Sequence, residues 1–137
     1  MVSHRARILL GVLGEGSKET VLKLAKGLSE AGFEVVYTEL KEPAAIMNSA
    51  IQESADHIGI AMLHGASAGQ IADILRLLEK ENAGSVTVTV GGYLEENEAR
   101  KIKSMGIKEV FPAGTKVESL IEWSKKNIVP LDPDREF

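Results

Sequence analysis

The chain has 137 residues, of which 44% are hydrophobic and 26% charged, the size and balance of one soluble globular domain. A formal net charge of −4 argues against general nucleic-acid binding, and the lack of cysteine excludes disulfides, thiolate chemistry and zinc-finger sites. The longest apolar run is far short of a membrane span and no signal-peptide pattern opens the chain, so a cytoplasmic protein without membrane contact is expected.

Short apolar runs alternate with helical patterns along the chain. The first run, residues 7–13, is aliphatic after Arg7 and too short for a helix, which is typical of a buried parallel strand. A helix with Ser17 as its N-cap candidate follows and ends at Gly32. The second run covers residues 34–38, and Pro43 opens the second helix as a first-turn proline.

The second half of the chain repeats this alternation. Three more strands are predicted at residues 57–62, 86–90 and 107–111, and helical patterns follow them at residues 71–78, 95–105 and 117–127. We therefore expect one domain over residues 1–127, followed by a loosely held C-terminal tail over residues 128–137, which holds two prolines among charges.

This strict alternation of strands and helices predicts an α/β fold. Five such units favour a parallel sheet with right-handed crossovers, helices on both faces and the flavodoxin-like (Rossmann-like) strand order 2-1-3-4-5. The first, third and fourth strands are then neighbours, so the loops at their carboxyl ends converge. Ligands bind at that edge of open α/β sheets, and the pattern therefore predicts a binding site there.

Glycine-bearing loops follow four of the predicted strands. Glycine lets the backbone turn tightly and approach a ligand closely. No nucleophile and base are paired in these loops, so no catalytic residue is assigned. The candidate cofactor-binding residues are Gly14, Glu15, Gly16, Ser17, Leu63, His64, Gly91, Gly92, Gly114 and Thr115.

The order and spacing of several short pieces indicate a family. The pieces are residues 7–10 (RILL), 31–35 (AGFEV), 42–43 (EP), 58–60 (IGI), 89–92 (TVGG), 105–111 (MGIKEVF) and 114–115 (GT). Together they resemble the cobalamin-binding domain of adenosylcobalamin-dependent acyl-CoA mutases, such as methylmalonyl-CoA mutase and its small-subunit relatives. The resemblance covers about residues 7–127.

The family's cobalamin signature has three parts. They are Asp-x-His-x-x-Gly after the first strand, Ser-x-Leu after the third and Gly-Gly after the fourth. The resemblance implies that the histidine is the lower axial ligand of cobalt and that the aspartate holds its other ring nitrogen. It also implies that the serine and the glycines accommodate a nucleotide tail buried in the domain.

This chain departs from two of the three parts. Thr20 stands where the family has the glycine of the first loop, and its branched side chain hinders the close approach of the nucleotide tail. The family's aspartate, histidine, last loop glycine and serine are replaced by Glu15, Ser17, Thr20 and Ala61, while Leu63, Gly91 and Gly92 are kept.

A serine hydroxyl is a poor ligand for cobalt, whereas imidazole is a good one. His64, in the loop after the third strand, is the candidate metal ligand in place of Ser17; the alternative is an exposed loop histidine that binds nothing. His57 and His4 are expected to be ordinary surface residues.

Two functions stay open. The resemblance implies a stand-alone subunit, not catalytic alone, that carries adenosylcobalamin for a larger mutase catalytic subunit and so serves an isomerase. The alternative is a degenerate relative that has lost cobalamin and acts as a non-enzymatic partner or regulator, or binds another small ligand.

Other readings of the site are weaker, and some properties stay open. Residues 14–18 match a phosphate site at a helix N-terminus only weakly, and simple capping of the helix is the favoured interpretation. A phosphate-binding receiver domain is disfavoured because the acidic cluster and lysine it needs at the strand ends are absent from the sequence. A homo-oligomer stays open.

Overall fold

The computed structural model describes residues 5–131 and contains one five-stranded parallel sheet in the order β2-β1-β3-β4-β5. The predicted flavodoxin-like strand order is confirmed. The strands are β1 (Arg7–Leu13), β2 (Glu34–Tyr37), β3 (His57–Met62), β4 (Thr87–Gly92) and β5 (Glu109–Phe111). The helices are α1 (Glu19–Glu30), α2 (Pro43–Gln52), α3 (Ala68–Lys80), α4 (Glu96–Lys103) and α5 (Val117–Asn127).

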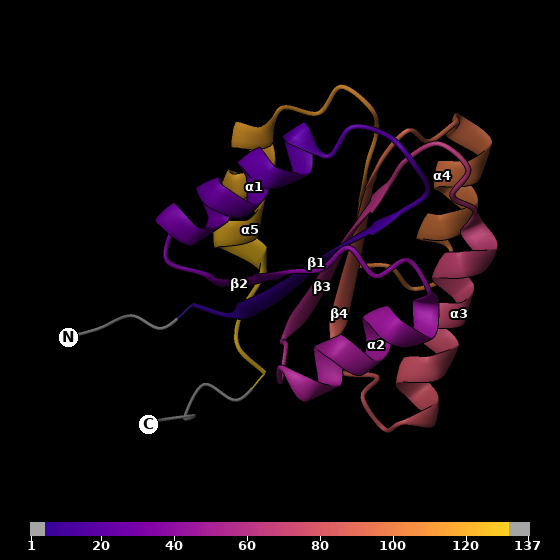
Figure 1. Cartoon of the computed structure of the whole chain (residues 1–137), viewed down its shortest axis with the longest axis horizontal. Coiled ribbons are helices and arrows are strands. Elements are labelled where there is room, and N and C mark those ends of the chain that lie inside the picture. Colours follow the sequence, from indigo (N-terminus) through magenta and orange to yellow (C-terminus); the bar gives the residue numbers. More distant parts are fainter. Residues whose placement is uncertain (1–4, 132–137) are drawn as a thin grey trace.

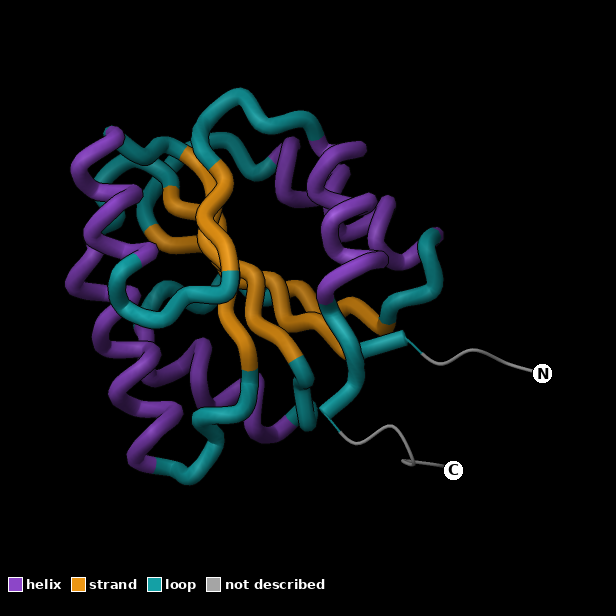
Figure 2. The backbone as a smooth tube through the Cα atoms, turned by 180° about the vertical axis from the view of Figure 1, so that it is seen from behind, coloured by secondary structure: helices purple, strands orange, loops and turns teal. Residues whose placement is uncertain are grey.

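Helices cover both faces of the sheet, as predicted (Figure 1). Helices α1 and α5 pack against each other on one face, while α2, α3 and α4 form a row on the other. Seen from behind, the strands form the middle layer between these two groups (Figure 2). No helix within residues 5–131 is long and apolar enough to cross a membrane.

Helix starts follow the local sequence. Pro43 occupies the first turn of α2, as predicted. Ser67 precedes α3, and its backbone N–H donates to the Gln70 side chain at 2.9 Å, one half of a capping box. The N-cap of α1 is Lys18 and not the predicted Ser17, which lies one residue earlier; the Ser17 Oγ still accepts a hydrogen bond from the Glu19 backbone N–H at 3.3 Å.

The two faces of the central strands differ in the size of their side chains. Because side chains alternate along a strand, β3 and β4 present one set to α2–α4 and the other to α1 and α5. The first set is large and aliphatic, and the second is mostly small or polar. The first set is Ile58, Ile60, Met62, Val88 and Val90, all buried in the main core; the second is His57, Gly59, Ala61, Thr87, Thr89 and Gly91.

The chain after α5 differs from the expected loose tail as far as residue 131. Ile128 is buried and packs with the core cluster of Ile8 and Leu10. The backbone N–H of Leu131 donates to the buried Asp56 carboxylate at 3.0 Å. These contacts hold residues 128–131 against the domain. Residues 132–137 and His4 lie outside the described residues, and the division at residue 127 stays a prediction.

Candidate functional site

A cavity of about 240 Å³ lies between the sheet and helices α1 and α5. It extends from the loops at the carboxyl edge of the sheet to the buried side chains of His57, Ser124 and Ile128. Its existence follows from the small residues of β3 and β4 on this face, because Gly59, Ala61 and Gly91 leave the space that larger side chains fill on the opposite face.

The loops after β1, β3 and β4 converge at the mouth of this cavity, as the strand order predicts. Of the ten candidate residues, six line the cavity: Ser17, Leu63, Gly91, Gly92, Gly114 and Thr115. The other four are Gly14, Glu15, Gly16 and His64, which lie beside the mouth and are not part of the lining.

A short backbone bridge ties the loop after β1 to the loop after β3. The Glu15 N–H donates to the His64 carbonyl oxygen at 2.8 Å, and the His64 N–H donates back to the Glu15 carbonyl oxygen at 3.1 Å. Gly14 makes this approach feasible: its φ is +86°, and a Cβ there would lie 2.6 Å from the same His64 oxygen. Glycine at position 14 is therefore a structural requirement of the mouth.

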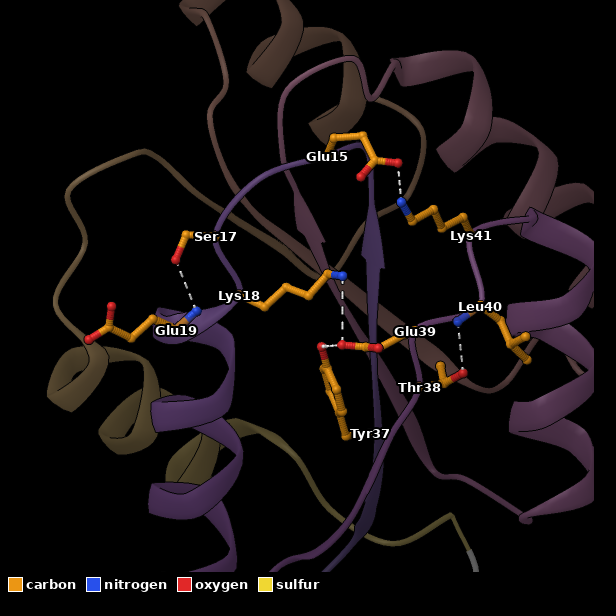
Figure 3. A network of polar contacts seen from close by, with 9 residues as sticks. All are labelled: Glu15, Ser17, Lys18, Glu19, Tyr37, Thr38, Glu39, Leu40 and Lys41. Atoms are coloured by element: carbon orange, nitrogen blue, oxygen red, sulfur yellow. Dashed lines mark hydrogen bonds and ion pairs between the residues drawn. The ribbon is translucent and has the colours of Figure 1, made fainter.

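The two charged side chains of this loop, Glu15 and Lys18, form ion pairs with residues that follow β2 (Figure 3). The Glu15 carboxylate pairs with Lys41, which lowers the pKa of Glu15. Lys18 lies 3.6 Å from the Glu39 carboxylate, which also accepts the Tyr37 hydroxyl at 3.0 Å. Burial, followed by this contact with Glu39, raises the pKa of Tyr37. Glu15 therefore faces Lys41 and does not form a carboxylate–histidine pair in its own loop.

The mouth offers few metal ligands. His64 is exposed, and its backbone but not its side chain is fixed by the bridge to Glu15. Within residues 5–131, no group of three or more histidine, cysteine, aspartate or glutamate side chains could hold a metal ion. A role for His64 as a lone ligand stays a prediction.

Two adjacent glycines at the end of β4 serve different purposes. Gly92 has a φ of +122°, and a Cβ there would lie 2.3 Å from the Met62 carbonyl oxygen, so the backbone requires glycine. Gly91 lines the cavity, and a Cβ there would lie 3.4 Å from the Phe111 Cβ, a tight but feasible contact. Gly91 thus keeps the cavity open, whereas Gly92 allows the turn.

His57 lies at the inner end of the cavity, and its expected surface position is wrong. The side chain is 1% exposed, with Nδ1 2.6 Å from Thr87 Oγ1 and Nε2 2.8 Å from Thr89 Oγ1. β3 is paired on both sides, and this face of the strand is covered by the α1–α5 layer. Burial, with a smaller contribution from the charge of Lys108, lowers the pKa of His57 to about 3. The imidazole is therefore neutral at physiological pH.

The sequence motifs predicted the loops at the mouth but not the inner walls of the cavity. These walls include His57, Gly59, Thr89, Phe111 and Ser124. A signal was present in the alternation of large and small residues in β3 (IGIAM) and β4 (VTVG). In a strand covered on both faces, such alternation marks one face that is packed and one that leaves room.

Comparison with known proteins gives a consistent family. Residues 10–121 match a family model described as B12 binding domain. The 2-hydroxyisobutanoyl-CoA mutase small subunit of Aquincola tertiaricarbonis is 32% identical over 118 residues, which are 85% of this chain and 87% of that protein. The methylmalonyl-CoA mutase large subunit of Propionibacterium freudenreichii subsp. shermanii is 27% identical over 132 residues, which are 94% of this chain but 18% of that protein.

Solved structures agree on the fold. A cobalamin-binding protein from Desulfitobacterium hafniense DCB-2 superposes with a TM-score of 0.73 at 17% identity, over 89% of this chain and 58% of that one. The signal receiver domain of the response regulator NarL from Mycobacterium tuberculosis gives a TM-score of 0.69 at 12% identity, over 90% of this chain and 95% of that one. At these identities the likeness shows the fold alone, which serves more than one function.

Proposed function

The chain belongs to the B12 binding domain family, and we propose that it carries cobalamin for a separate, larger mutase subunit. Adenosylcobalamin, when bound, supplies the radical chemistry of its cobalt–carbon bond, and the protein supplies binding and orientation. The chain spans 87% of a mutase small subunit but 18% of a large one, which supports a role as the cofactor-binding component.

The cavity beneath α1 and α5 is the observation that carries this proposal. Protein interiors are close-packed, so an open space against the centre of a sheet calls for an explanation. The walls are largely apolar and formed by residues such as Leu10, Val21 and Phe111, and the mouth lies at the carboxyl edge. Such a space suits a planar, mostly apolar ring, and the nucleotide base of cobalamin is one. We assign the cavity to that base.

The residues fit the nucleotide tail better than they fit the cobalt. Ser17 presents a hydroxyl where the family presents imidazole, and its Oγ already accepts the Glu19 N–H. We therefore propose that the loop after β1 does not ligate cobalt. His64, exposed beside the mouth, is the candidate side chain for that position in this proposal.

A second function is favoured by the departures from the signature. Ser17, Thr20 and Ala61 all border the cavity, and each replaces a residue of the family's cobalamin signature. In this alternative the chain is a degenerate relative that no longer binds cobalamin and acts as a partner or regulator, or takes another small ligand into the same cavity.

Retention of cobalamin separates the two functions. The purified chain is mixed with hydroxocobalamin or adenosylcobalamin, free ligand is removed, and the absorption spectrum of the protein is recorded. Cobalamin is expected to stay with the protein. No retention at high micromolar concentration contradicts the proposal and leaves the degenerate relative.

A cavity-filling variant shows whether retention uses the assigned space. Gly91→Val places a branched side chain on the cavity wall at a position without the left-handed backbone of its neighbour Gly92. We expect Gly91→Val to lose at least about ten-fold in affinity, because an overfilled site excludes the base. His64→Ala is the matched test of ligation: a change in the spectrum of bound cobalamin supports ligation by His64, and an unchanged spectrum excludes it.

A further inference from the structure

The inner end of the cavity holds buried polar side chains beside apolar ones such as Ile128. His57, Thr89 and Ser124 lie there with 1%, 8% and 7% of their surface exposed. Polar groups this deeply buried are costly unless hydrogen-bonded. Ser124 Oγ donates to the Leu120 carbonyl oxygen at 2.7 Å, so its proton is used within α5. Thr89 is held by His57, and it forms part of the lining itself.

The bond to His57 leaves Thr89 with hydrogen-bonding capacity to spare. A neutral imidazole has one N–H donor and one bare nitrogen, so one of the two threonines accepts from His57 and the other donates to it. A threonine hydroxyl has one donor and two acceptor sites. If Nε2–H donates to Thr89, the Thr89 proton stays free; if Thr89 donates to Nε2, its lone pairs stay free. In both tautomers Thr89 keeps an unused group on the cavity wall.

The depth of Thr89 matches the far edge of a base. Thr89 lies two residues before Gly91 on β4, about 7 Å deeper along an extended strand. His57 lies four residues before Ala61 on β3, about 13 Å deeper. In a nucleoside whose sugar stays at the mouth, the five-membered ring that is bonded to the sugar lies nearer the mouth. The six-membered ring then lies toward the inner end of the cavity. The group that Thr89 meets is therefore on the six-membered ring.

We propose that Thr89, positioned by His57, reads the far edge of the base of the bound cobamide and favours a base that carries hydrogen-bonding groups there. Adenine is such a base, because its six-membered ring carries an amino group and ring nitrogens. Dimethylbenzimidazole, the base of cobalamin, carries two methyl groups on that edge and leaves Thr89 without a partner. This inference rests on the proposed function, because it requires the base to enter the cavity.

Binding can be followed without a catalytic partner. Trp123 is the single tryptophan of the chain, and its ring lies 5.2 Å from that of Phe111, a residue of the cavity lining. Quenching of Trp123 fluorescence reports titration with three probes: cobalamin, the cobamide with adenine as its base, and cobinamide, which lacks the nucleotide. We expect the adenine cobamide to bind about five-fold more tightly than cobalamin, the gain of one net hydrogen bond.

Two threonine variants form a matched pair. Thr89→Val removes the hydroxyl that lines the cavity, and we expect the two cobamides to bind it equally or cobalamin to bind more tightly. Thr87→Val removes the other partner of His57 but is not part of the lining, so the preference for adenine is expected to remain. Thr89→Ser keeps the hydroxyl and is expected to keep the preference. If Thr89 acts only by supporting the fold, both valine variants are expected to lose the preference for adenine to the same extent.

The outcomes distinguish this inference from the proposed function. Equal affinity of the wild-type chain for both cobamides, each bound more tightly than cobinamide, overturns the role of Thr89 and leaves the carrier function standing. This comparison needs no variant, so it holds even if Thr89→Val fails to fold. If neither cobamide binds more tightly than cobinamide, the base does not use the cavity, so this inference and the assignment of the cavity to the base both fail, whereas the carrier function fails only if no cobamide is retained. Loss of the preference in Thr87→Val as well as Thr89→Val also overturns the reading by Thr89.

Discussion

Single residues at the mouth decide what chemistry the loop after β1 can offer. Ser17 accepts a backbone N–H, Glu15 is paired with Lys41, and Thr20 adds bulk beside the cavity. The loop therefore holds neither an imidazole nor a carboxylate free to orient one. A histidine that binds a metal is usually oriented by a second group, such as a carboxylate that accepts its other ring N–H. In this loop the carboxylate of Glu15 is paired with Lys41 instead.

Restoring the family's residues at this loop is expected to restore nitrogen ligation. In the double variant Ser17→His, Thr20→Gly, the imidazole stands in the first loop and the added bulk is gone. When His64→Ala is added to remove the other candidate ligand, cob(II)alamin bound to this variant is expected to show nitrogen hyperfine splitting in its electron paramagnetic resonance spectrum, and the chain that carries His64→Ala alone is expected to lack it. The control is Ser17→Ala, Thr20→Gly, also with His64→Ala. Identical spectra for the double variant and this control would show that position 17 does not reach the metal.

The buried His57 makes stability depend on pH. Its pKa is lowered to about 3 in the folded chain from an ordinary value of 6.5, so the unfolded state binds the proton more readily. The stability that neutral His57 allows is present above pH 6.5 and is lost as the pH falls toward 3. From pH 7 to pH 5 the free energy of unfolding is expected to fall by about 2 kcal/mol through this group.

Urea unfolding of wild type and His57→Gln at both pH values measures this contribution. Glutamine has a donor and an acceptor for Thr87 and Thr89 but does not titrate. The change in the free energy of unfolding between the two pH values is compared for the two proteins. Subtracting one change from the other removes the effect of carboxylates such as Glu15 and Glu109, whose lowered pKa values also reduce stability in acid. Parallel pH profiles for the two proteins would mean that His57 is already protonated or accessible in the folded state.

The sequence predicts the helices and strands but not the surface of the sheet that lines the cavity. Alternation of apolar runs and helical patterns predicted all ten elements and their order, because glycine and Pro43 mark the ends of local structure. The loops at the carboxyl edge were predicted to converge by the strand order alone. The role of the α1–α5 face of β3 and β4 was not predicted, because the burial of His57 depends on helices that come from both ends of the chain. No local pattern around His57 carries that information.

The end of β4 provides a test at the level of one element. Gly92→Ala puts a Cβ 2.3 Å from the backbone oxygen of Met62 at a φ of +122°, and backbone atoms cannot move aside cheaply. The free energy of unfolding is expected to fall by at least about 2 kcal/mol. Gly106→Ala is the control, since its φ of +97° is similar but nothing lies within 4 Å of a Cβ there. It is expected to cost about 1 kcal/mol. Equal losses in the two variants would refute the close approach at Gly92.

At the scale of the whole molecule, one sheet separates a packed half from a half with room inside. Helices α2, α3 and α4 close over large aliphatic side chains, and this half stabilises the fold. Helices α1 and α5 cover a smaller core cluster around Ile8 and Leu10 together with the small and polar residues of β3 and β4, and this half holds the cavity. The mouth of that cavity lies at the edge where the three central strands end. The open half is the space that we assign to the nucleotide base.

The absorption spectrum of adenosylcobalamin bound to the His64→Ala chain, in which the other candidate nitrogen ligand is absent, tests this arrangement most directly. If the cavity takes the nucleotide base, the base leaves cobalt, and the bound cofactor shows the base-off spectrum, with its corrin absorption shifted to shorter wavelength than in free adenosylcobalamin at neutral pH. Cofactor that is retained with the base-on spectrum, or not retained at all, would contradict the assignment of the cavity to the base.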